Sequence, residues 1–76
     1  AEIVERDQDT ARLRQALARL DEEKRELLIL SRYQNLKYRE IGEIYGCEES
    51  VVKGRVFRAL RDLREIYFEL ARRKVS

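Results

Sequence analysis

The sequence predicts an all-α domain of four helices. Three observations point to this class: the chain contains no proline, its apolar residues recur at helical spacing, and no segment alternates apolar and polar residues as a half-buried strand does. Hydrophobic residues make up 43% of the 76 residues, which is enough for a compact core despite the high charge. We therefore expect one folded domain over residues 10–70, with a linker or disordered end at 1–9 and a basic tail at 71–76.

The first two predicted helices are separated at Asp21. Thr10 can act as an N-cap, and the apolar residues at 13, 16, 17 and 20 follow the i, i+3, i+4, i+7 pattern of one helix face. Glu22 and Glu23 then fall in the first turn of a second helix, where the helix dipole favours acids, and leucines supply its apolar stripe. The second helix is predicted to run roughly from 22 to 33.

The third and fourth predicted helices form the outline of a helix-turn-helix, without winged elements. A short helix at 38–45, whose apolar pattern includes Ile44, stops at Gly46, which can adopt a positive φ, and a long helix follows the turn. Ile41 and Val52 are placed to meet between the two helices, and Gly42 is small where the second helix must approach closely. An αα-hairpin in any small bundle could show the same pattern, and this alternative stays open.

Positive charge is concentrated in the C-terminal third of the chain. Residues 53–76 hold eight Lys and Arg against three Asp and Glu, whereas residues 1–9 hold one basic and four acidic residues. When the fourth helix is projected at 100° per residue, one side is apolar and the other carries a phenylalanine among basic residues. The apolar side consists of Val52, Val56, Ala59 and Leu63, and the opposite side of Lys53, Gly54, Phe57, Arg58, Arg61 and Arg64.

Phe57 is the informative residue of that second side. A solvated helix face seldom carries a large apolar group, whereas a helix in the major groove of DNA uses Arg and Lys for guanine edges and phosphates, and an apolar side chain for a thymine methyl. The pattern therefore predicts double-stranded DNA as a partner. The alternative is that Phe57 contacts another helix of the domain.

Composition excludes several other classes of function. Without histidine, and with one cysteine, the chain has no imidazole base, no internal disulfide and no thiolate cage for a metal, so we expect no enzyme, no cofactor and no metal. The longest apolar run, Leu27 to Leu30, is far shorter than the ~18 residues that span a bilayer, and no signal-peptide pattern opens the chain. We expect a cytoplasmic protein without a membrane partner.

Three segments resemble region 4 of bacterial RNA polymerase sigma factors, closest to the extracytoplasmic-function group. They are ALARLDEEKRELLIL, NLKYREIGEIYG and ESVVKGRVFRALRDLRE, whose order and spacing match those of the family without gaps, and the resemblance extends from about Arg12 to Glu65. The resemblance implies a domain that binds the minus-35 promoter element while the polymerase core holds it. A complete sigma factor needs a further domain for the minus-10 element, so the chain is interpreted as an excised C-terminal domain.

The resemblance also implies roles for individual residues. Lys53, Arg55, Phe57 and Arg58 match family positions that contact the bases or backbone of the element, and Lys37, Tyr38, Ser50 and Val51 match positions near flanking phosphates; Arg61 joins them from the basic face. Arg55 lies beside the buried side of its helix, so an internal pair with Glu40 or Glu43 is an equal alternative to phosphate contact. Lys37 also departs from the usual Ser or Thr cap, which removes a capping oxygen.

Two further functions stay open. The apolar run Ile66, Tyr67, Phe68, Leu70 exceeds what one helix face needs, so it either packs on the first helix or forms a partner surface for the polymerase or an anti-sigma factor. The domain would then be chiefly a protein-interaction module. A free-standing helix-turn-helix regulator is the other alternative, and it predicts a stable dimer that binds paired half-sites.

Overall fold

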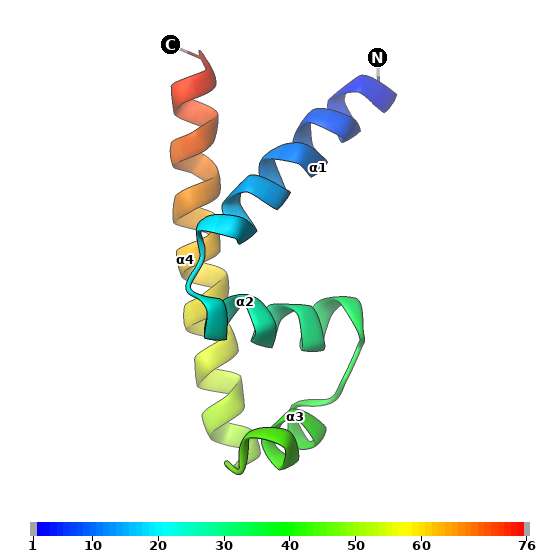
Figure 1. Cartoon of the computed structure of the whole chain (residues 1–76), viewed down its shortest axis with the longest axis vertical. Helices are drawn as coiled ribbons and strands as arrows, with labels where there is room; N and C mark the ends of the chain where they lie inside the picture. Colours follow the sequence, from blue (N-terminus) through cyan, green and yellow to red (C-terminus); the bar gives the residue numbers. More distant parts are fainter. Residues whose placement is uncertain (1, 76) are drawn as a thin grey trace.

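The computed structural model describes the backbone of residues 2–75 and the side chains of residues 9–72. Its elements are α1 (Glu2–Arg19), α2 (Glu22–Leu28), the π-helical segment η1 (Ile29–Tyr33), α3 (Tyr38–Tyr45) and α4 (Glu49–Val75). No strand occurs among residues 2–75, so the fold has the all-α class that the sequence predicts. Helix α4 runs the length of the molecule, and α1 diverges from it toward the end where both termini lie (Figure 1).

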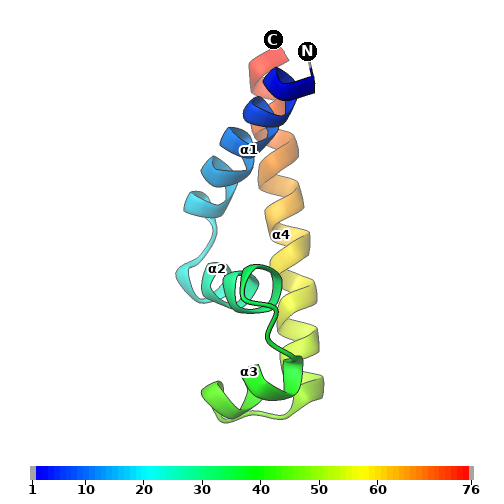
Figure 2. The ribbon, with the colours of Figure 1, turned by 90° about the vertical axis from the view of Figure 1, so that its right-hand side faces the viewer.

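The other two helices pack against the N-terminal half of α4. Helix α2 crosses α4 near its middle, and α3 lies beside the first turns of α4, at the end of the molecule opposite the termini (Figures 1 and 2). The molecule is elongated, with extents of 43 × 22 × 16 Å. Helices α1, α2 and α3 therefore all pack against α4.

The first and last helices extend beyond residues 10–70, the limits of the predicted domain. Helix α1 begins at Glu2, so the segment for which the sequence predicts a linker or a disordered end is helical from residue 2, and Thr10 lies inside the helix instead of capping it. Residues 2–9 contain neither glycine nor proline, and their acids suit the positive end of the helix dipole, so the segment is compatible with a helical backbone. Helix α4 likewise continues to Val75, through the predicted basic tail. Residues 1 and 76 lie outside the described residues.

A short bend joins α1 to α2, and Arg25 bridges it. The Arg25 guanidinium donates through Nη1 to the carbonyl oxygens of Leu17 at 3.4 Å and Ala18 at 3.3 Å. These carbonyls belong to the last turn of α1, where helical amide partners run out, although the Leu17 carbonyl also accepts from the Leu20 amide at 3.1 Å. Arg25 thus satisfies the end of one helix from the body of the next.

The second predicted helix has the expected limits, but it changes from α-helical to π-helical hydrogen bonding along its length. After Leu28 the backbone forms η1, and the amide of Gln34 donates to the carbonyl of Ile29 at 3.1 Å. Asn35 then adopts a φ of 55°, in the left-handed region that asparagine tolerates better than most residues. The wider turn and the reversed φ together end the helix and direct the chain toward α3.

The hydrophobic core lies where α2, α3 and the end of α1 meet α4. Leu27, Ile41, Val52 and Val56 are the largest side chains with essentially no exposure. The remaining buried apolar residues are Ala16, Leu20, Leu28 and Ala59. Burial of a branched aliphatic side chain contributes roughly 1.5–3 kcal/mol, so this cluster supplies most of the driving force for folding.

Within residues 2–75, no helix combines the length and the apolar character that crossing a bilayer requires.

A polar contact fastens α3 to α2 at the edge of this core. The Tyr45 hydroxyl donates to Oε1 of Glu26, and the Tyr45 ring is half-buried against the core. Burial, then the hydrogen bond to Glu26 and the negative charges of Glu26 and Glu23, raise the pKa of Tyr45 from 10.0 to about 12. The contact therefore favours the neutral phenol.

We predict that Gly42→Ala destabilises the domain, whereas Gly54→Ala does not. A Cβ at Gly42 would lie 2.4 Å from the backbone oxygen of Cys47, so the turn would have to move, at a cost of about 1–3 kcal/mol. A Cβ at Gly54 would meet nothing within 4 Å, and alanine gains about 0.5–1 kcal/mol in a helix. Thermal and urea unfolding of both variants checks this, and equal stabilities would contradict it.

We also predict a pH-dependent contribution from Tyr45. Because its pKa is raised in the folded state, its contribution to the free energy of unfolding is fully present below pH 10.0 and is lost as the pH rises toward about 12. Tyr45→Phe should therefore be less stable than the parent at neutral pH, and the difference should shrink above pH 10.0. Urea unfolding across this range measures the difference. Tyr33→Phe is the control, because that hydroxyl is exposed and makes no recorded hydrogen bond; a constant Tyr45→Phe deficit would contradict the assignment.

Candidate nucleic-acid interface

The turn between α3 and α4 fixes the helix-turn-helix geometry. Gly46 has a φ of 71°, and the amide of Cys47 donates to the carbonyl of Gly42 at 2.9 Å, which closes the end of α3. Ile41 and Val52 are both buried in the core that joins the two helices, as predicted. The neighbour that requires Gly42 to be small is the backbone of the turn itself, at Cys47, and not helix α4 as expected.

Lys37 precedes α3, and its side chain supplies no capping oxygen to the first turn of the helix. The backbone amide of Lys37 donates to Oε1 of Glu40 at 2.8 Å, which is half of a capping box. An ammonium group has no lone pair to return the bond, so the Lys37 side chain stays exposed to solvent. A positive charge is therefore available at the N-terminal end of α3.

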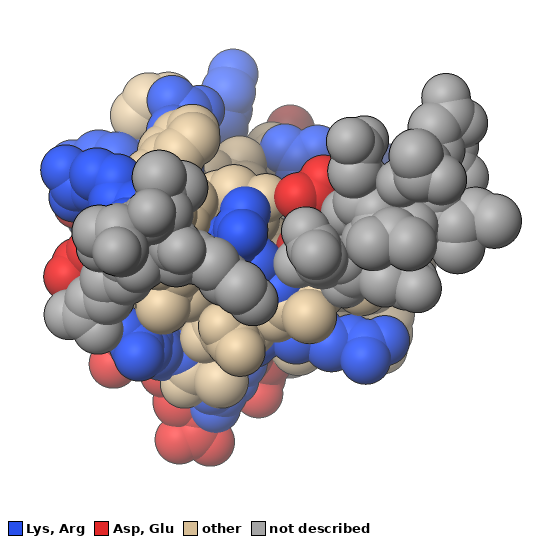
Figure 3. All heavy atoms as spheres, turned by 90° about the horizontal axis from the view of Figure 1, so that it is seen from above, with Lys and Arg blue, Asp and Glu red and all other residues tan. Residues whose placement is uncertain are grey.

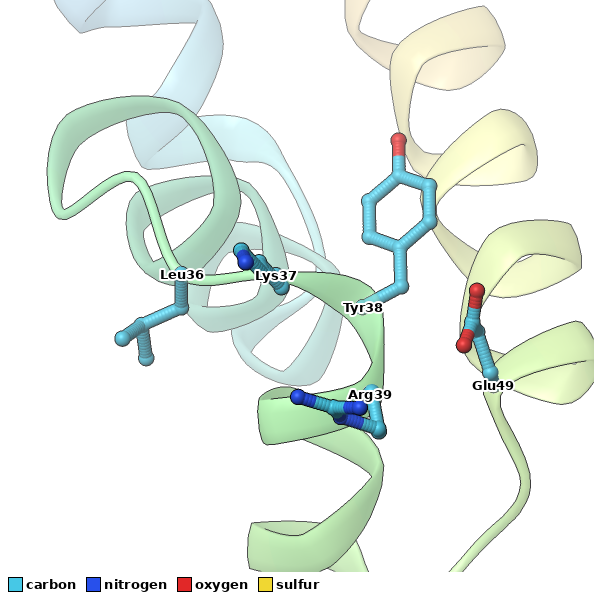
Figure 4. Close-up of a pocket in the computed structure, with 5 residues that line it drawn as sticks. All are labelled: Leu36, Lys37, Tyr38, Arg39 and Glu49. Carbon is cyan, nitrogen blue, oxygen red and sulfur yellow. The ribbon is translucent and has the colours of Figure 1, made fainter.

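A hollow of about 450 Å³ opens between the start of α3 and the start of α4. Figure 4 shows the Tyr38 ring rising beside α4, with Glu49 facing it from the first turn of that helix and Arg39 below. Tyr38 is half-buried and packs on the core, whereas Lys37 and Arg39 are exposed. The first turn of α4 also exposes Ser50 and Val51. The structure thus brings Lys37 and Tyr38 close to the N-terminal turn of α4.

Arg39 is a residue that the sequence-based prediction missed. It lines the same hollow as Lys37 and is exposed. Its position one residue after Tyr38, on the polar side of a short amphipathic helix, is the signal that could have identified it. Glu49 lines the hollow together with Lys37 and Arg39, so this part of the surface carries both negative and positive charge.

The face of α4 that points away from the core carries Phe57. This side chain is 71% exposed, so the alternative in which it packs against another helix is wrong. Lys53 and Arg58 are exposed on the same helix, while Val52, Val56 and Ala59 on the opposite side are buried. A phenylalanine side chain that is exposed to water among Lys and Arg residues is unfavourable in free energy unless another surface covers it.

Arg55 lies at the edge of α4 that faces α2. Its Nη1 is 3.7 Å from Oε1 of Glu23, so it has an internal partner, but this partner is on α2 and not at Glu40 or Glu43 of α3. The projection placed Arg55 beside the buried side correctly, and the crossing of α2 decides which acid it meets. Both side chains remain substantially exposed, at 41% for Arg55 and 62% for Glu23, and such pairs contribute about 0–1 kcal/mol.

Arg61 is also engaged within the domain. Its Nε and Nη2 atoms lie 3.4 and 3.3 Å from Oδ1 of Asp62, and the Lys24 ammonium donates to Oδ2 of the same carboxylate. The hydrogen bond from Lys24, helped by the charges of Lys24 and Arg61, lowers the pKa of Asp62 below 3.8. Asp62 thus links α2 to α4 as an ionised group. Among the described residues, Lys53 and Arg58 make no comparable ion pair.

The described residues contain no group of His, Cys, Asp and Glu that could hold a metal ion. The arrangement offers instead the exposed Phe57 ring, the exposed Lys53 and Arg58 side chains beside it on α4, and the exposed Lys37 and Arg39 side chains at the start of α3. Such a surface suits a polyanion that also presents apolar groups, as duplex DNA does in its major groove.

Comparison with known families gives one match. The family model for "Sigma-70, region 4" matches residues 10–63, which cover most of the chain, including α2, α3 and the helix-turn-helix. No curated protein and no solved structure matches the chain significantly. The match includes the exposed face around Phe57 and the turn at Gly46. The chain therefore belongs to the sigma-70 region 4 family, the promoter-binding domains of sigma factors.

Proposed function

We propose that this domain binds the minus-35 element of a promoter as duplex DNA, with the exposed face of α4 in the major groove. The single observation that carries the proposal is Phe57, which is 71% exposed between Lys53 and Arg58 on a helix whose other side is buried. In the groove, Phe57 would cover a thymine methyl, and the neighbouring Lys53 and Arg58 side chains would contact guanine edges or phosphates. The mechanism is recognition without catalysis.

The start of α3 supports the same docking. Lys37 and Arg39 lie beside the first turn of α4, where Ser50 and Val51 are exposed, so they would approach the phosphates that flank the groove. Tyr38 is half-buried and would position this turn more than contact DNA. Arg55 and Arg61 would reach phosphate only by leaving Glu23 and Asp62.

The polymerase core is the proposed second partner, and the proposed location is the cytoplasm. A mainly apolar hollow of about 370 Å³ lies between α1, η1 and α4, lined by Leu13, Arg32, Leu60, Leu63, Arg64, Tyr67 and Phe68. Seen from the end where the termini lie, uncharged side chains occupy the space between the two helices, interspersed with Lys and Arg (Figure 3). This surface supports the second candidate function, a protein contact to the polymerase or an anti-sigma factor, and the two functions can coexist.

The C-terminal aromatic residues divide between the two roles that the sequence left open. Tyr67 packs toward α1, because its ring lies 5.8 Å from the Arg12 guanidinium carbon and its hydroxyl 3.3 Å from Oδ1 of Asp9. Phe68 is 56% exposed and meets Tyr67 edge to face. Tyr67 therefore packs within the domain, whereas Phe68 is available to a partner.

We predict that Phe57→Ala and Arg58→Ala weaken binding to a minus-35 duplex, the duplex being selected from a random pool at low salt. Loss of an arginine that reads a base edge costs roughly 1–3 kcal/mol. Phe68→Ala and Arg14→Ala are matched controls, because both side chains are exposed but lie away from the proposed face. Fluorescence anisotropy of labelled duplex measures the affinities. Unchanged affinity in both test variants would refute the proposal.

Lys53→Ala should flatten the salt dependence of binding. If Lys53 neutralises one phosphate, the slope of log affinity against log salt should fall by about 0.9. The same anisotropy titration, repeated over a series of salt concentrations, gives the slope. Binding that survives raised salt, to a polymerase fragment but not to DNA, would favour the protein-interaction function instead.

A further inference from the structure

The N-terminal turn of α2 is tied to α4 by two ion pairs of adjacent residues. Glu23 pairs with Arg55, and Lys24 pairs with Asp62. Arg55 and Asp62 are seven positions apart, close to two full turns, so they lie on the same side of α4. Neighbouring residues of opposite charge on α2 thus contact residues of opposite charge along one edge of α4.

The two pairs differ in how firmly they are held. The side chains of Lys24 and Asp62 are 36% and 25% exposed, and a hydrogen bond joins them. Arg55 and Glu23 are more exposed and lie 3.7 Å apart, beyond hydrogen-bonding distance. The first pair therefore secures α2 against α4, whereas the second can separate at little cost.

The looser pair lies next to the proposed DNA-binding face. Arg55 and Glu23 line a hollow of about 210 Å³ together with Arg58, Asp21, Lys24 and Leu27. Arg58 is exposed and belongs to the face around Phe57, so a phosphate that approached Arg58 would come near the Arg55 guanidinium as well. Two carboxylates, from Asp21 and Glu23, border the space that such a phosphate would enter.

We propose that Glu23 acts as an internal competitor of the DNA backbone for Arg55. In the free domain its carboxylate pairs with the guanidinium; on DNA, Arg55 exchanges this partner for a phosphate, which carries the same charge and offers the same acceptor oxygens. Glu23 is then a positioning residue that lowers the affinity for any polyanion, because part of the new contact replaces an existing one. This inference rests on the proposed DNA binding, and it concerns a residue outside the helix-turn-helix.

The competition predicts that Glu23→Gln binds duplex DNA about two- to fivefold more tightly than the parent, the range that an exposed ion pair can contribute. Glu22→Gln is the matched control. Glu22 is the neighbouring acid in the same helical turn, is exposed and makes no recorded ion pair, so its replacement changes the net charge equally. Any gain due to net charge or to the helix dipole appears in both variants, and only Glu23→Gln releases Arg55.

A double-mutant cycle with Arg55→Ala completes the test. Arg55→Ala should weaken binding and lower the salt slope by about 0.9, the value for one lost phosphate contact. In the Arg55→Ala background, Glu23→Gln should gain no more than Glu22→Gln does. Thermal unfolding of each variant shows whether the fold is retained, and the salt slope reports phosphate contact, which a purely structural role of Glu23 would leave unchanged.

The outcomes separate this inference from the proposed function. If the parent binds the selected duplex, and Glu23→Gln and Glu22→Gln gain equally, the competition is refuted while DNA binding stands. A Glu23→Gln gain that persists in the Arg55→Ala background refutes it as well. If the parent shows no duplex binding at low salt, both the competition and the proposed function are refuted. A gain that is specific to Glu23→Gln and depends on Arg55 supports the proposal.

Discussion

The small and β-branched side chains on one side of α4 are the constraint on which the rest of the structure depends. Val52, Val56 and Ala59 are fully buried, and α3, α2 and the end of α1 approach α4 over them. Larger residues would hold these helices away from α4 and open the core. Because one side of the helix is committed to packing, the other side is left to solvent, and Phe57 is exposed there as a consequence.

Several features could be predicted from the sequence because they depend on local chemistry. Gly46 and the apolar pattern before it marked the end of α3, and the structure places the third helix at the predicted 38–45. The N-terminal limit of α1 could not be predicted, since residues 2–9 carry no sustained apolar period to mark them as helical. The π-helical turn of η1 was also missed, because apolar spacing does not reveal which carbonyl each amide will bond.

The exposed and buried sides of α4 were predictable from the sequence, but the ion pairs at its edge were not. A helical projection identifies which side of α4 a residue occupies, and it placed Phe57 opposite the core and Arg55 at the edge. It cannot show which helix crosses at that edge, so it favoured acids of α3 over Glu23 of α2. Ile44 illustrates the same limit, because its spacing suggested packing and yet it is 61% exposed. Tertiary arrangement decides both cases.

Because α4 is uninterrupted, it fixes the relative orientation of two surfaces of the domain. Its 27 residues extend over about 40 Å, with Phe57 on the first half and the apolar hollow beside Phe68 on the second. No glycine or proline follows Gly54, so no hinge separates the two. Each residue of helix turns the following side chains by about 100°, so the number of residues between the two surfaces sets their relative orientation. A sigma factor built on this domain would hold its promoter at a fixed rotation relative to any protein seated on the hollow.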